Sequence, residues 1–134
     1  MKVYESRDIR NLALIGHGGA GKTTLANAMA FLAGSCPRMG SVEQGNALTD
    51  FTPDEVEHQI SINLALAYAE HMGAKVNLID TPGYLDFAGE VKAGLRVADA
   101  ACLVVNGVAG VEVGTERVWA YSEAERIPRM VFVG

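Results

Sequence analysis

The chain carries four short runs that are apolar at almost every position. They cover residues 11–15, 76–79, 101–105 and 130–133. A strand with one buried face alternates apolar and polar residues, whereas a parallel strand buried on both faces is apolar throughout. These runs therefore predict parallel β-strands in the interior of a sheet.

Longer segments that mix apolar and polar residues lie between these runs. They cover residues 22–33, 90–97 and 114–126, and their patterns are typical of helices. Strands that alternate with helices form crossover units, and the helices of such units cover both faces of the sheet. The sequence thus predicts an α/β fold with a doubly wound, mostly parallel sheet.

Residues 60–68 follow a different pattern, with an apolar side chain at every second position from Ile62 to Tyr68. This alternation is typical of a half-buried strand, although the alanine and leucine content leaves a helix as the alternative. A turn at residues 71–74 leads directly into the run at residues 76–79, which indicates an antiparallel hairpin. We therefore expect one antiparallel strand in the sheet.

Residues 34–59 are polar and show no periodicity. A loop of this length in a compact domain is usually functional or mobile. Its acidic residues are predicted to form a solvated loop rather than a metal cage; they are Asp50, Asp54, Glu55 and Glu57. In the last helical segment, Trp119 and Tyr121 are expected to pack into the core.

Composition narrows the class of protein without identifying it. The chain has 134 residues, 49% hydrophobic and 20% charged, as expected for one soluble globular domain. No apolar run approaches the roughly 18 residues that a membrane helix needs, and the N-terminus carries no signal-peptide pattern. Cys36 and Cys102 lack metal-ligand spacing and are too few for a disulfide framework. We expect reduced thiols, a cytoplasmic protein and no membrane partner.

The net charge is −5, which argues against broad electrostatic attraction to nucleic acid. No direct DNA binding is therefore expected. Local contacts with a ribonucleoprotein remain compatible with this charge.

Residues 16–23 read Gly-His-Gly-Gly-Ala-Gly-Lys-Thr, a complete G-x-x-x-x-G-K-[ST] phosphate-binding motif. The motif lies between the first apolar run and the first helical segment, as in a P-loop NTPase. Glycines let backbone N–H groups turn toward a phosphate, and the following helix contributes its positive N-terminal end. Lys22 is predicted to reach the β- and γ-phosphates, and the Thr23 hydroxyl to bind Mg²⁺. The nucleotide-binding residues predicted here are Gly16, His17, Gly18, Gly19, Ala20, Gly21, Lys22, Thr23 and Thr24.

A second motif, Asp80-Thr81-Pro82-Gly83, follows the apolar run at residues 76–79. In a P-loop fold, a carboxylate at the end of this strand lies beside the Mg²⁺ and binds it directly or through water. Gly83 can bring its backbone N–H close to a γ-phosphate because it has no side chain. Asp-Thr-Pro-Gly alone is a common turn, but together with the phosphate loop it indicates a GTPase-type switch.

These motifs and their surroundings resemble the N-terminal part of the GTP-binding domain of elongation factor G and its close relatives. The resemblance includes Gly-His-x-x-Ala-Gly-Lys-Thr-Thr at residues 16–24 and Asp-Thr-Pro-Gly-Tyr-Leu-Asp-Phe at residues 80–87. It continues through residues 95–101, 108–112 and 127–129. These last groups have no evident role in binding or catalysis, so they indicate the family more specifically than the phosphate motifs do.

The resemblance implies GTP and GDP as ligands, Mg²⁺ as cofactor and the ribosome as partner of the full-length protein. The family fixes its Mg²⁺ with a threonine of the first switch, in Glu-Arg-Gly-Ile-Thr-Ile. The matching residues 57–62 read Glu-His-Gln-Ile-Ser-Ile, so Ser61 keeps the hydroxyl. The implied metal ligands are thus Thr23, Ser61 and Asp80, with an ordinary strand-edge serine as the alternative for Ser61.

The sequence departs from the family pattern at three places. Tyr84 stands where the family has a histidine that orients the hydrolytic water, and a phenol can donate one hydrogen bond but cannot replace an imidazole. Gly19 replaces an aspartate of the phosphate loop, which removes a candidate ligand for an auxiliary monovalent ion. The guanine-reading Asn-Lys-x-Asp belongs directly after residue 133, where the chain ends at Gly134.

We therefore expect residues 1–134 to be a partial GTP-binding domain, a fragment of a larger multidomain protein truncated before the guanine-recognition motif. The preference for GTP over ATP rests on the resemblance alone. This fragment by itself is expected to be inactive, to bind nucleotide weakly and to self-associate through an exposed apolar edge at residues 129–133.

The leading hypothesis is a GTP-hydrolysing domain of an elongation factor G-like translation factor, with Tyr84 and Lys22 as its catalytic residues. The alternative, motivated by Tyr84, is a GTP-dependent ribosome-binding module with weak or no hydrolysis. A P-loop ATPase of another kind is a third hypothesis.

Overall fold

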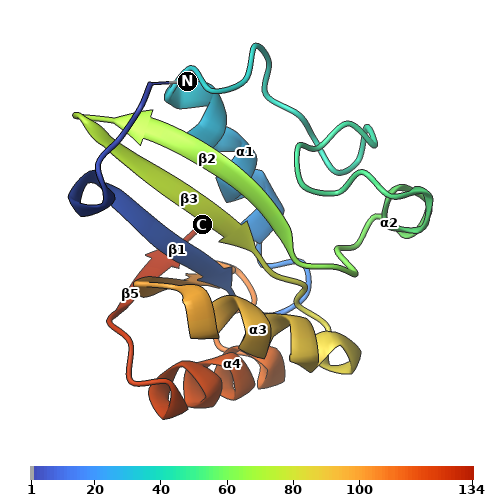
Figure 1. Cartoon of the computed structure of the whole chain (residues 1–134). Coiled ribbons are helices and arrows are strands. Elements are labelled where there is room, and N and C mark those ends of the chain that lie inside the picture. The colour runs from blue at the N-terminus through green and yellow to red at the C-terminus, as the bar shows by residue number, and fades with distance from the viewer. Residues whose placement is uncertain (1) are drawn as a thin grey trace.

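A five-stranded sheet with helices on both faces forms the centre of the computed structural model, which describes residues 2–134 (Figure 1). Its strands are β1 (Ile9–Ile15), β2 (Ala65–His71), β3 (Ala74–Asp80), β4 (Ala100–Val105) and β5 (Arg129–Val133). The strand order is β2-β3-β1-β4-β5. Only the β2–β3 pair is antiparallel among the described strands. The predicted doubly wound, mostly parallel sheet with one antiparallel strand is confirmed.

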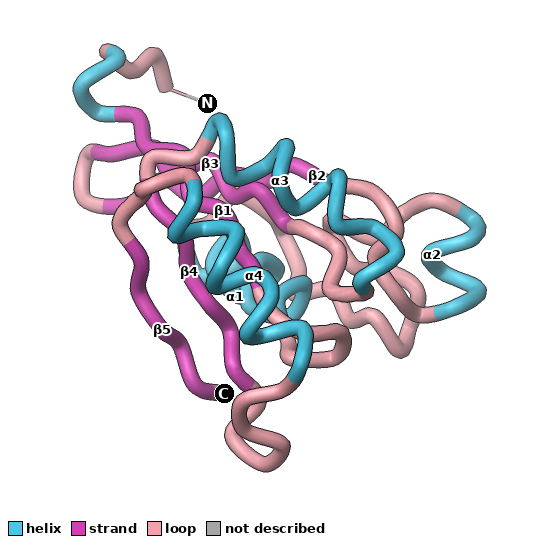
Figure 2. The backbone as a smooth tube through the Cα atoms, turned by 90° about the horizontal axis from the view of Figure 1, so that it is seen from below, coloured by secondary structure: helices cyan, strands magenta, loops and turns pink. Residues whose placement is uncertain are grey.

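The long helices lie where the sequence predicts them, with bounds that differ by at most two residues. They are α1 (Lys22–Leu32), α3 (Ala88–Val97) and α4 (Val113–Ala124). Helix α1 covers one face of the sheet, and α3 and α4 cover the other (Figures 1 and 2). Short helical turns add η1 (Ser6–Asp8), α2 (Pro53–His58) and η2 (Leu85–Phe87). Every helix within residues 2–134 is too short or too polar to cross a membrane.

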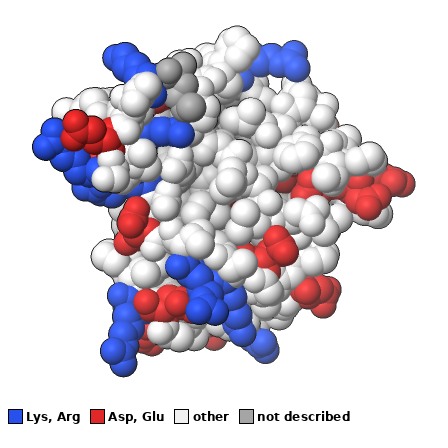
Figure 3. Space-filling view, viewed as in Figure 1, with Lys and Arg blue, Asp and Glu red and all other residues white. Residues whose placement is uncertain are grey.

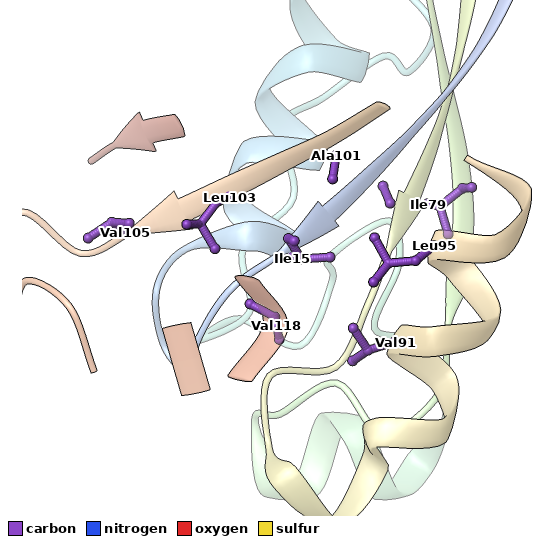
Figure 4. Close-up of a cluster of buried hydrophobic side chains, with 9 residues drawn as sticks. Ile15, Ile79, Val91, Leu95, Ala101, Leu103, Val105 and Val118 are labelled. Carbon is purple, nitrogen blue, oxygen red and sulfur yellow. The ribbon is translucent and has the colours of Figure 1, made fainter. Parts of the chain in front are cut away.

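Each face of the sheet carries its own apolar cluster. Ile15, Leu95 and Val118 belong to the cluster under α3 and α4 (Figure 4). Leu14 and Val104 belong to the cluster under α1. Neighbouring residues of a strand point to opposite faces, and Leu14 and Ile15 are both fully buried. Residues 12–15 are therefore apolar at every position because both faces of the strand lie in the core.

The antiparallel strand β2 differs from its prediction in position and in orientation. It begins at Ala65, five residues later than expected. Its alternation is present, but the buried side chains are Ala65 and Ala69, whereas Leu66 is 70% exposed. Ala65 pairs with Asp80 of β3, on the face that α1 covers. The strand buries its alanines against α1 rather than Leu66, whereas Leu64, just before the strand, packs on the cluster under α3 and α4 as its pattern indicates.

The hairpin turn between β2 and β3 is confirmed. Met72 and Gly73 connect the strands, with φ angles of +49° and +79°. Two successive residues with positive φ define a type I′ turn, whose twist matches that of the strands it joins.

Helix α2 lies inside the segment that was predicted to be an aperiodic loop. Thr52 Oγ1 accepts a hydrogen bond from Glu55 N at 3.4 Å, and Glu55 Oε2 accepts one from Thr52 N at 3.2 Å. This reciprocal capping box, with Pro53 at the first turn, starts the helix. The Thr-Pro-Asp-Glu sequence carried this signal, although no hydrophobic period accompanied it.

The Glu55 side chain organises the return of this segment toward the sheet. It is 1% exposed, and its Oε1 accepts hydrogen bonds from Ile62 N at 3.1 Å and Asn63 N at 3.0 Å. The prediction of a solvated acidic loop is therefore wrong for Glu55 and also for Asp50, which is 4% exposed. The other two acidic residues are exposed, and Figure 3 shows acidic side chains gathered over α2.

The aromatic residues of α4 divide between two environments. Tyr121 packs against the cluster under α3 and α4, as predicted. Trp119 is 39% exposed, so its predicted place in the core is wrong. Its ring lies in an apolar groove beside β5, with the Arg129 guanidinium 4.2 Å from the ring centroid.

Strand β5 lies at an edge of the described sheet (Figure 2), and most of its apolar side chains are exposed. Among them, Met130, Val131 and Val133 are 53%, 56% and 64% exposed. Unpaired apolar edges template pairing with other chains. The edge expected at residues 129–133 is thus present, and the self-association it favours stays a prediction.

We expect Glu55→Gln to destabilise the chain at pH 7 by about 1–3 kcal/mol, because it leaves buried hydrogen bonds weakened or unmade. Burial raises the pKa of Glu55, but the hydrogen bonds from Asn63, Thr52 and Ile62 outweigh this effect and hold the pKa below its ordinary value. The ionised carboxylate therefore stabilises the fold above its ordinary pKa, and this contribution disappears as pH falls through the lowered value. Urea unfolding of both proteins from neutral to acidic pH measures the difference.

The exposed Glu57 provides the matched control, because Glu57→Gln should change stability by less than about 0.5 kcal/mol. Equal stabilities of the wild type and Glu55→Gln at pH 7 would contradict the structural role of this carboxylate.

We expect Val131→Lys to reduce self-association of the chain, because a charge on an edge strand opposes pairing. Val108→Lys, at a fully exposed loop position, adds the same charge away from the edge and should leave association unchanged. Sedimentation velocity at several concentrations measures both. A wild-type chain that stays monomeric throughout its soluble range would refute the prediction.

Candidate functional site: a phosphate-binding cavity

A cavity of about 230 Å³ lies where the carboxyl end of β1 meets the start of α1. Three segments that are separate in sequence line it: the phosphate loop, residues 42–61 and the turn after β3. Because β1 and β3 are parallel neighbours, their carboxyl ends open at the same edge of the sheet. The predicted site residues among its walls are Gly18, Gly19, Gly21, Lys22, Thr23, Thr24, Ser61, Gly83 and Tyr84.

The phosphate loop needs its glycines for two physical reasons. Gly19 and Gly21 have φ angles of +76° and +99°, a region that side chains other than glycine rarely adopt. Gly16 has no room for a side chain, because a Cβ there would collide with the Val104 carbonyl oxygen. Gly21 is also the N-cap of α1, and no side chain caps this helix. The free N–H groups of its first turn therefore face the cavity as donors for an anion.

Lys22 is buried at the centre of the loop, with 5% exposure. Its Nζ donates hydrogen bonds to Gly16 O at 3.2 Å and His17 O at 2.9 Å. Burial lowers the pKa of Lys22 to about 8, while Asp80 and Asp50 oppose this shift. The amine therefore remains mostly protonated at neutral pH and offers a positive charge to a phosphate.

Hydroxyl and carboxylate groups form a network beneath the cavity. Asp80 Oδ2 accepts hydrogen bonds from Thr23 Oγ1 at 2.8 Å and Thr49 Oγ1 at 2.6 Å. Ser61 Oγ donates to Asp50 Oδ1 at 2.7 Å and lies 3.1 Å from Thr23 Oγ1. Burial raises the pKa of Asp80 against the hydrogen bonds from Thr49 and Thr23 and the charge of Lys22. Burial likewise raises the pKa of Asp50.

Two details of this network fit a hard divalent cation such as Mg²⁺. Thr23 Oγ1 and Ser61 Oγ lie 3.1 Å apart, and each hydroxyl also has a carboxylate within hydrogen-bonding distance, so four oxygen-bearing side chains gather at one point. The second oxygen of Asp80, Oδ1, is buried and has no hydrogen-bond partner among the described residues. Oxygen donors of this kind are what Mg²⁺ prefers.

Thr49 and Asp50 are site residues that the sequence analysis did not assign. Asp50 lines the cavity, and Thr49 is 1% exposed and donates to Asp80 across 31 residues of sequence. Neither belongs to a local motif, and only the folded chain brings them to the end of β3. The sequence carries no signal for Thr49, and it predicted that Asp50 lies in a solvated loop.

The turn after β3 crosses the phosphate loop closely. A Cβ at Gly83 would lie 2.5 Å from Lys22 Nζ and 2.6 Å from Gly18 N, so no larger residue fits there. Tyr84 follows with its side chain 45% exposed at the cavity wall. The fold thus brings Gly83 and Tyr84, both predicted site residues of this turn (the second switch, residues 80–84), to the site.

The side chains of His17 and Ala20 do not line the cavity. Ala20 packs into the apolar cluster under α1. His17 Nδ1 accepts a hydrogen bond from Gly114 N at 3.2 Å, and its Nε2 lies 3.5 Å from Glu112 Oε1. A Cβ at Gly114 would collide with the imidazole. His17 thereby ties the phosphate loop to the start of α4, and only its backbone is available to a nucleotide.

Residues 7–134 match the family described as the elongation factor Tu GTP binding domain. The chain is 42% identical over 133 residues to elongation factor G 2 of Streptomyces coelicolor, an alignment that covers 99% of this chain and 19% of that protein. It is 43% identical over 124 residues to the mitochondrial ribosome-releasing factor 2 of Lodderomyces elongisporus, covering 92% of this chain and 15% of that protein.

The fold also matches the solved structure of a protein from Thermus thermophilus, with which this chain shares 46% sequence identity at a TM-score of 0.91. That match covers 93% of this chain and 19% of the other. The chain thus spans less than a fifth of the length of these relatives. By the match over residues 7–134, the chain belongs to the family of elongation factor Tu GTP-binding domains.

Proposed function

We propose that the chain binds GTP and GDP with Mg²⁺, as part of the GTP-binding domain of an elongation factor G-like translation factor. In the full-length protein this domain hydrolyses GTP on the ribosome, in the cytoplasm. The observation that carries the proposal is the convergence of Lys22, Thr23, Ser61 and Gly83 from three segments on one cavity. The names of the relatives, elongation factor G 2 and ribosome-releasing factor 2, support the ribosome as partner.

The phosphate loop and the first turn of α1 bind the phosphates. Backbone N–H groups of residues 16–24 donate to phosphate oxygens, and the α1 N-terminus favours their negative charge. Lys22 Nζ, held by two loop carbonyls, neutralises the β- and γ-phosphates. Gly83 brings its N–H to the γ-phosphate because its backbone lies against the loop.

Thr23 and Ser61 ligate Mg²⁺, and Asp80 lies beside it. Asp80 accepts a hydrogen bond from the Thr23 hydroxyl, so the Thr23 oxygen could offer a lone pair to a cation. Bound Mg²⁺ neutralises charge on the β- and γ-phosphates. Thr49 also donates to Asp80, which gives this buried carboxylate a second hydroxyl partner.

Tyr84 and Lys22 are the proposed catalytic residues. Lys22 stabilises the charge that develops on the transferred phosphoryl group. Tyr84 lines the cavity, and its phenolic hydroxyl can hydrogen-bond one water molecule. The preference for GTP over ATP rests on the family. Because the chain spans less than a fifth of its relatives, we propose that it is inactive in hydrolysis by itself.

We expect Lys22→Ala to lower the affinity of the full-length protein for GTP at least about thirtyfold, because truncating one member of a buried charge pair costs about 2–5 kcal/mol. Titration with a fluorescent GTP analogue in the presence of Mg²⁺ measures the effect, and competition with ATP tests the base preference. The exposed Lys2 supplies the control variant Lys2→Ala. An unchanged affinity of a folded Lys22→Ala protein would rule out the site assignment.

We expect ribosomes to raise single-turnover phosphate release from the full-length protein well above the ribosome-free rate. Tyr84→Phe should lower that stimulated rate at least about tenfold, because the water loses its hydrogen-bond partner. Tyr84→His should keep the stimulated rate of the wild type or raise it. Absence of any ribosome stimulation in the wild type would favour a GTP-dependent binding module instead. Equal rates for the wild type and Tyr84→Phe would remove Tyr84 from the catalytic residues.

A further inference from the structure

Asn27 is a polar residue on the buried side of α1. It is 1% exposed, and the other buried residues of this helix include Ala26 and Ala30. Asparagine is a poor helix former, and a buried amide costs free energy unless hydrogen bonds compensate for it. Alanine at this position would avoid both costs. The reason for an amide here therefore lies in the groups that it binds.

The Asn27 amide joins two backbone segments. Its Nδ2 donates a hydrogen bond to Thr23 O at 2.7 Å, one turn earlier in α1, and its Oδ1 accepts one from Leu48 N at 2.8 Å. A carbonyl oxygen only accepts and a backbone N–H only donates, so these two partners fix the orientation of the amide. One side chain thus connects the backbone of a proposed Mg²⁺ ligand to the loop between α1 and β2.

The loop passes closely over this amide. A Cβ at Gly40 would lie 3.0 Å from Asn27 Oδ1 and 2.9 Å from Ala47 Cα, so a larger residue would push the loop away from α1. Asn46 Oδ1 accepts a hydrogen bond from Ser41 N at 2.8 Å and closes this part of the loop. Two stretches of the loop therefore pack together at the point where Asn27 binds.

The residues that follow Leu48 belong to the network beneath the cavity. Thr49 Oγ1 donates to Asp80 Oδ2 at 2.6 Å, and Asp50 Oδ1 accepts from Ser61 Oγ at 2.7 Å. Because Thr49 and Asp50 directly follow Leu48, fixing the N–H of Leu48 limits where their side chains can lie.

We propose that Asn27 is a positioning residue, which holds the loop between α1 and β2 against the start of α1 and thereby raises the affinity of the site for Mg²⁺. The inference rests on the proposed function, in which Thr23, Ser61 and Asp80 hold the metal. Asn27 is not among the residues that line the cavity, so it acts through the loop and not by contact with a ligand.

The effect on Mg²⁺ follows from preorganisation. Oxygen ligands that are held in place before a cation arrives lose less conformational freedom when it binds. Side chains that orient metal ligands contribute about 10- to 100-fold to metal affinity. Asn27 lies one step further from the metal than such side chains, so we expect the lower value. Lys22 and the phosphate loop lie outside this linkage, so the affinity that remains without Mg²⁺ should not depend on Asn27.

The test compares dissociation constants of the full-length protein for a fluorescent β,γ-imido analogue of GTP in excess Mg²⁺ and in EDTA. Their ratio gives the contribution of Mg²⁺ to binding. Asn27→Ala should lower this contribution about tenfold, whereas the affinity in EDTA should stay within about twofold of the wild type. A role in folding alone would not change the ratio.

Leu48→Pro removes the same hydrogen bond from the loop side, because proline has no backbone N–H. It should lower the Mg²⁺ contribution by a similar factor without any change in α1. The double variant with Asn27→Ala should lose no more than about twofold beyond either single variant, since both changes remove one contact.

Asn11→Ala is the matched control. The Asn11 amide also donates one hydrogen bond, to Val97 O at 3.1 Å, and accepts one, from Asn77 Nδ2 at 2.8 Å. Asn11 lies in the amino-terminal half of β1, whereas the cavity lies at the carboxyl end of this strand. The Mg²⁺ contribution of this variant should match that of the wild type. Urea unfolding confirms that every variant is folded.

Three results would overturn the role of Asn27 and leave the proposed function intact: an unchanged Mg²⁺ contribution in folded Asn27→Ala, an equal loss of affinity with and without Mg²⁺, or losses that multiply in the double variant. A loss for Asn11→Ala as large as that for Asn27→Ala would overturn it as well. A wild-type protein that fails to bind the analogue in excess Mg²⁺ would instead contradict the proposed function, and the inference with it.

Discussion

A carboxylate that is 1% exposed at the end of β3 is the group on which the phosphate site depends. Burying a charge is costly unless other groups compensate for it. Asp80 meets this requirement in part, because its Oδ2 accepts hydrogen bonds from Thr23 at the start of α1 and Thr49 of the long loop, with the Lys22 ammonium close enough to lower its pKa, while Oδ1 has no partner among the described residues. The arrangement of three chain segments thus follows from the need to solvate one anion inside the protein.

Two further buried carboxylates, Asp50 and Glu55, hold the part of the long loop between α1 and β2 that lies nearest the sheet. Asp50 binds the Ser61 hydroxyl, and Glu55 binds the backbone of residues 62 and 63. The side chain of Asn27 extends this support from α1, because it accepts a hydrogen bond from Leu48 N and donates one to Thr23 O. A loop of this length, without strands of its own, is therefore held by side chains that replace a sheet as partners for its backbone.

The sequence was sufficient wherever structure follows from local chemistry or from burial on two faces. Leu14 and Ile15 mark an interior strand, and the phosphate loop carries its own conformational requirements. The sequence was insufficient where the burial of a side chain depended on which element covers that face of the sheet. The alternation in β2 did not reveal that the alanines face α1, and Trp119 lies beside an edge strand rather than inside. Thr49 could not be found because its partner is 31 residues away and no motif links them.

Phosphate loops are commonly regarded as self-contained cassettes that can be moved between scaffolds, and His17 shows why this one is not. Its imidazole fills the space in front of Gly114, 97 residues further along the chain, and uses that residue's N–H as its partner. A host protein with any larger residue at the corresponding helix start would push the loop out of shape. A scaffold that receives this loop with its histidine therefore also needs a glycine at the start of the facing helix.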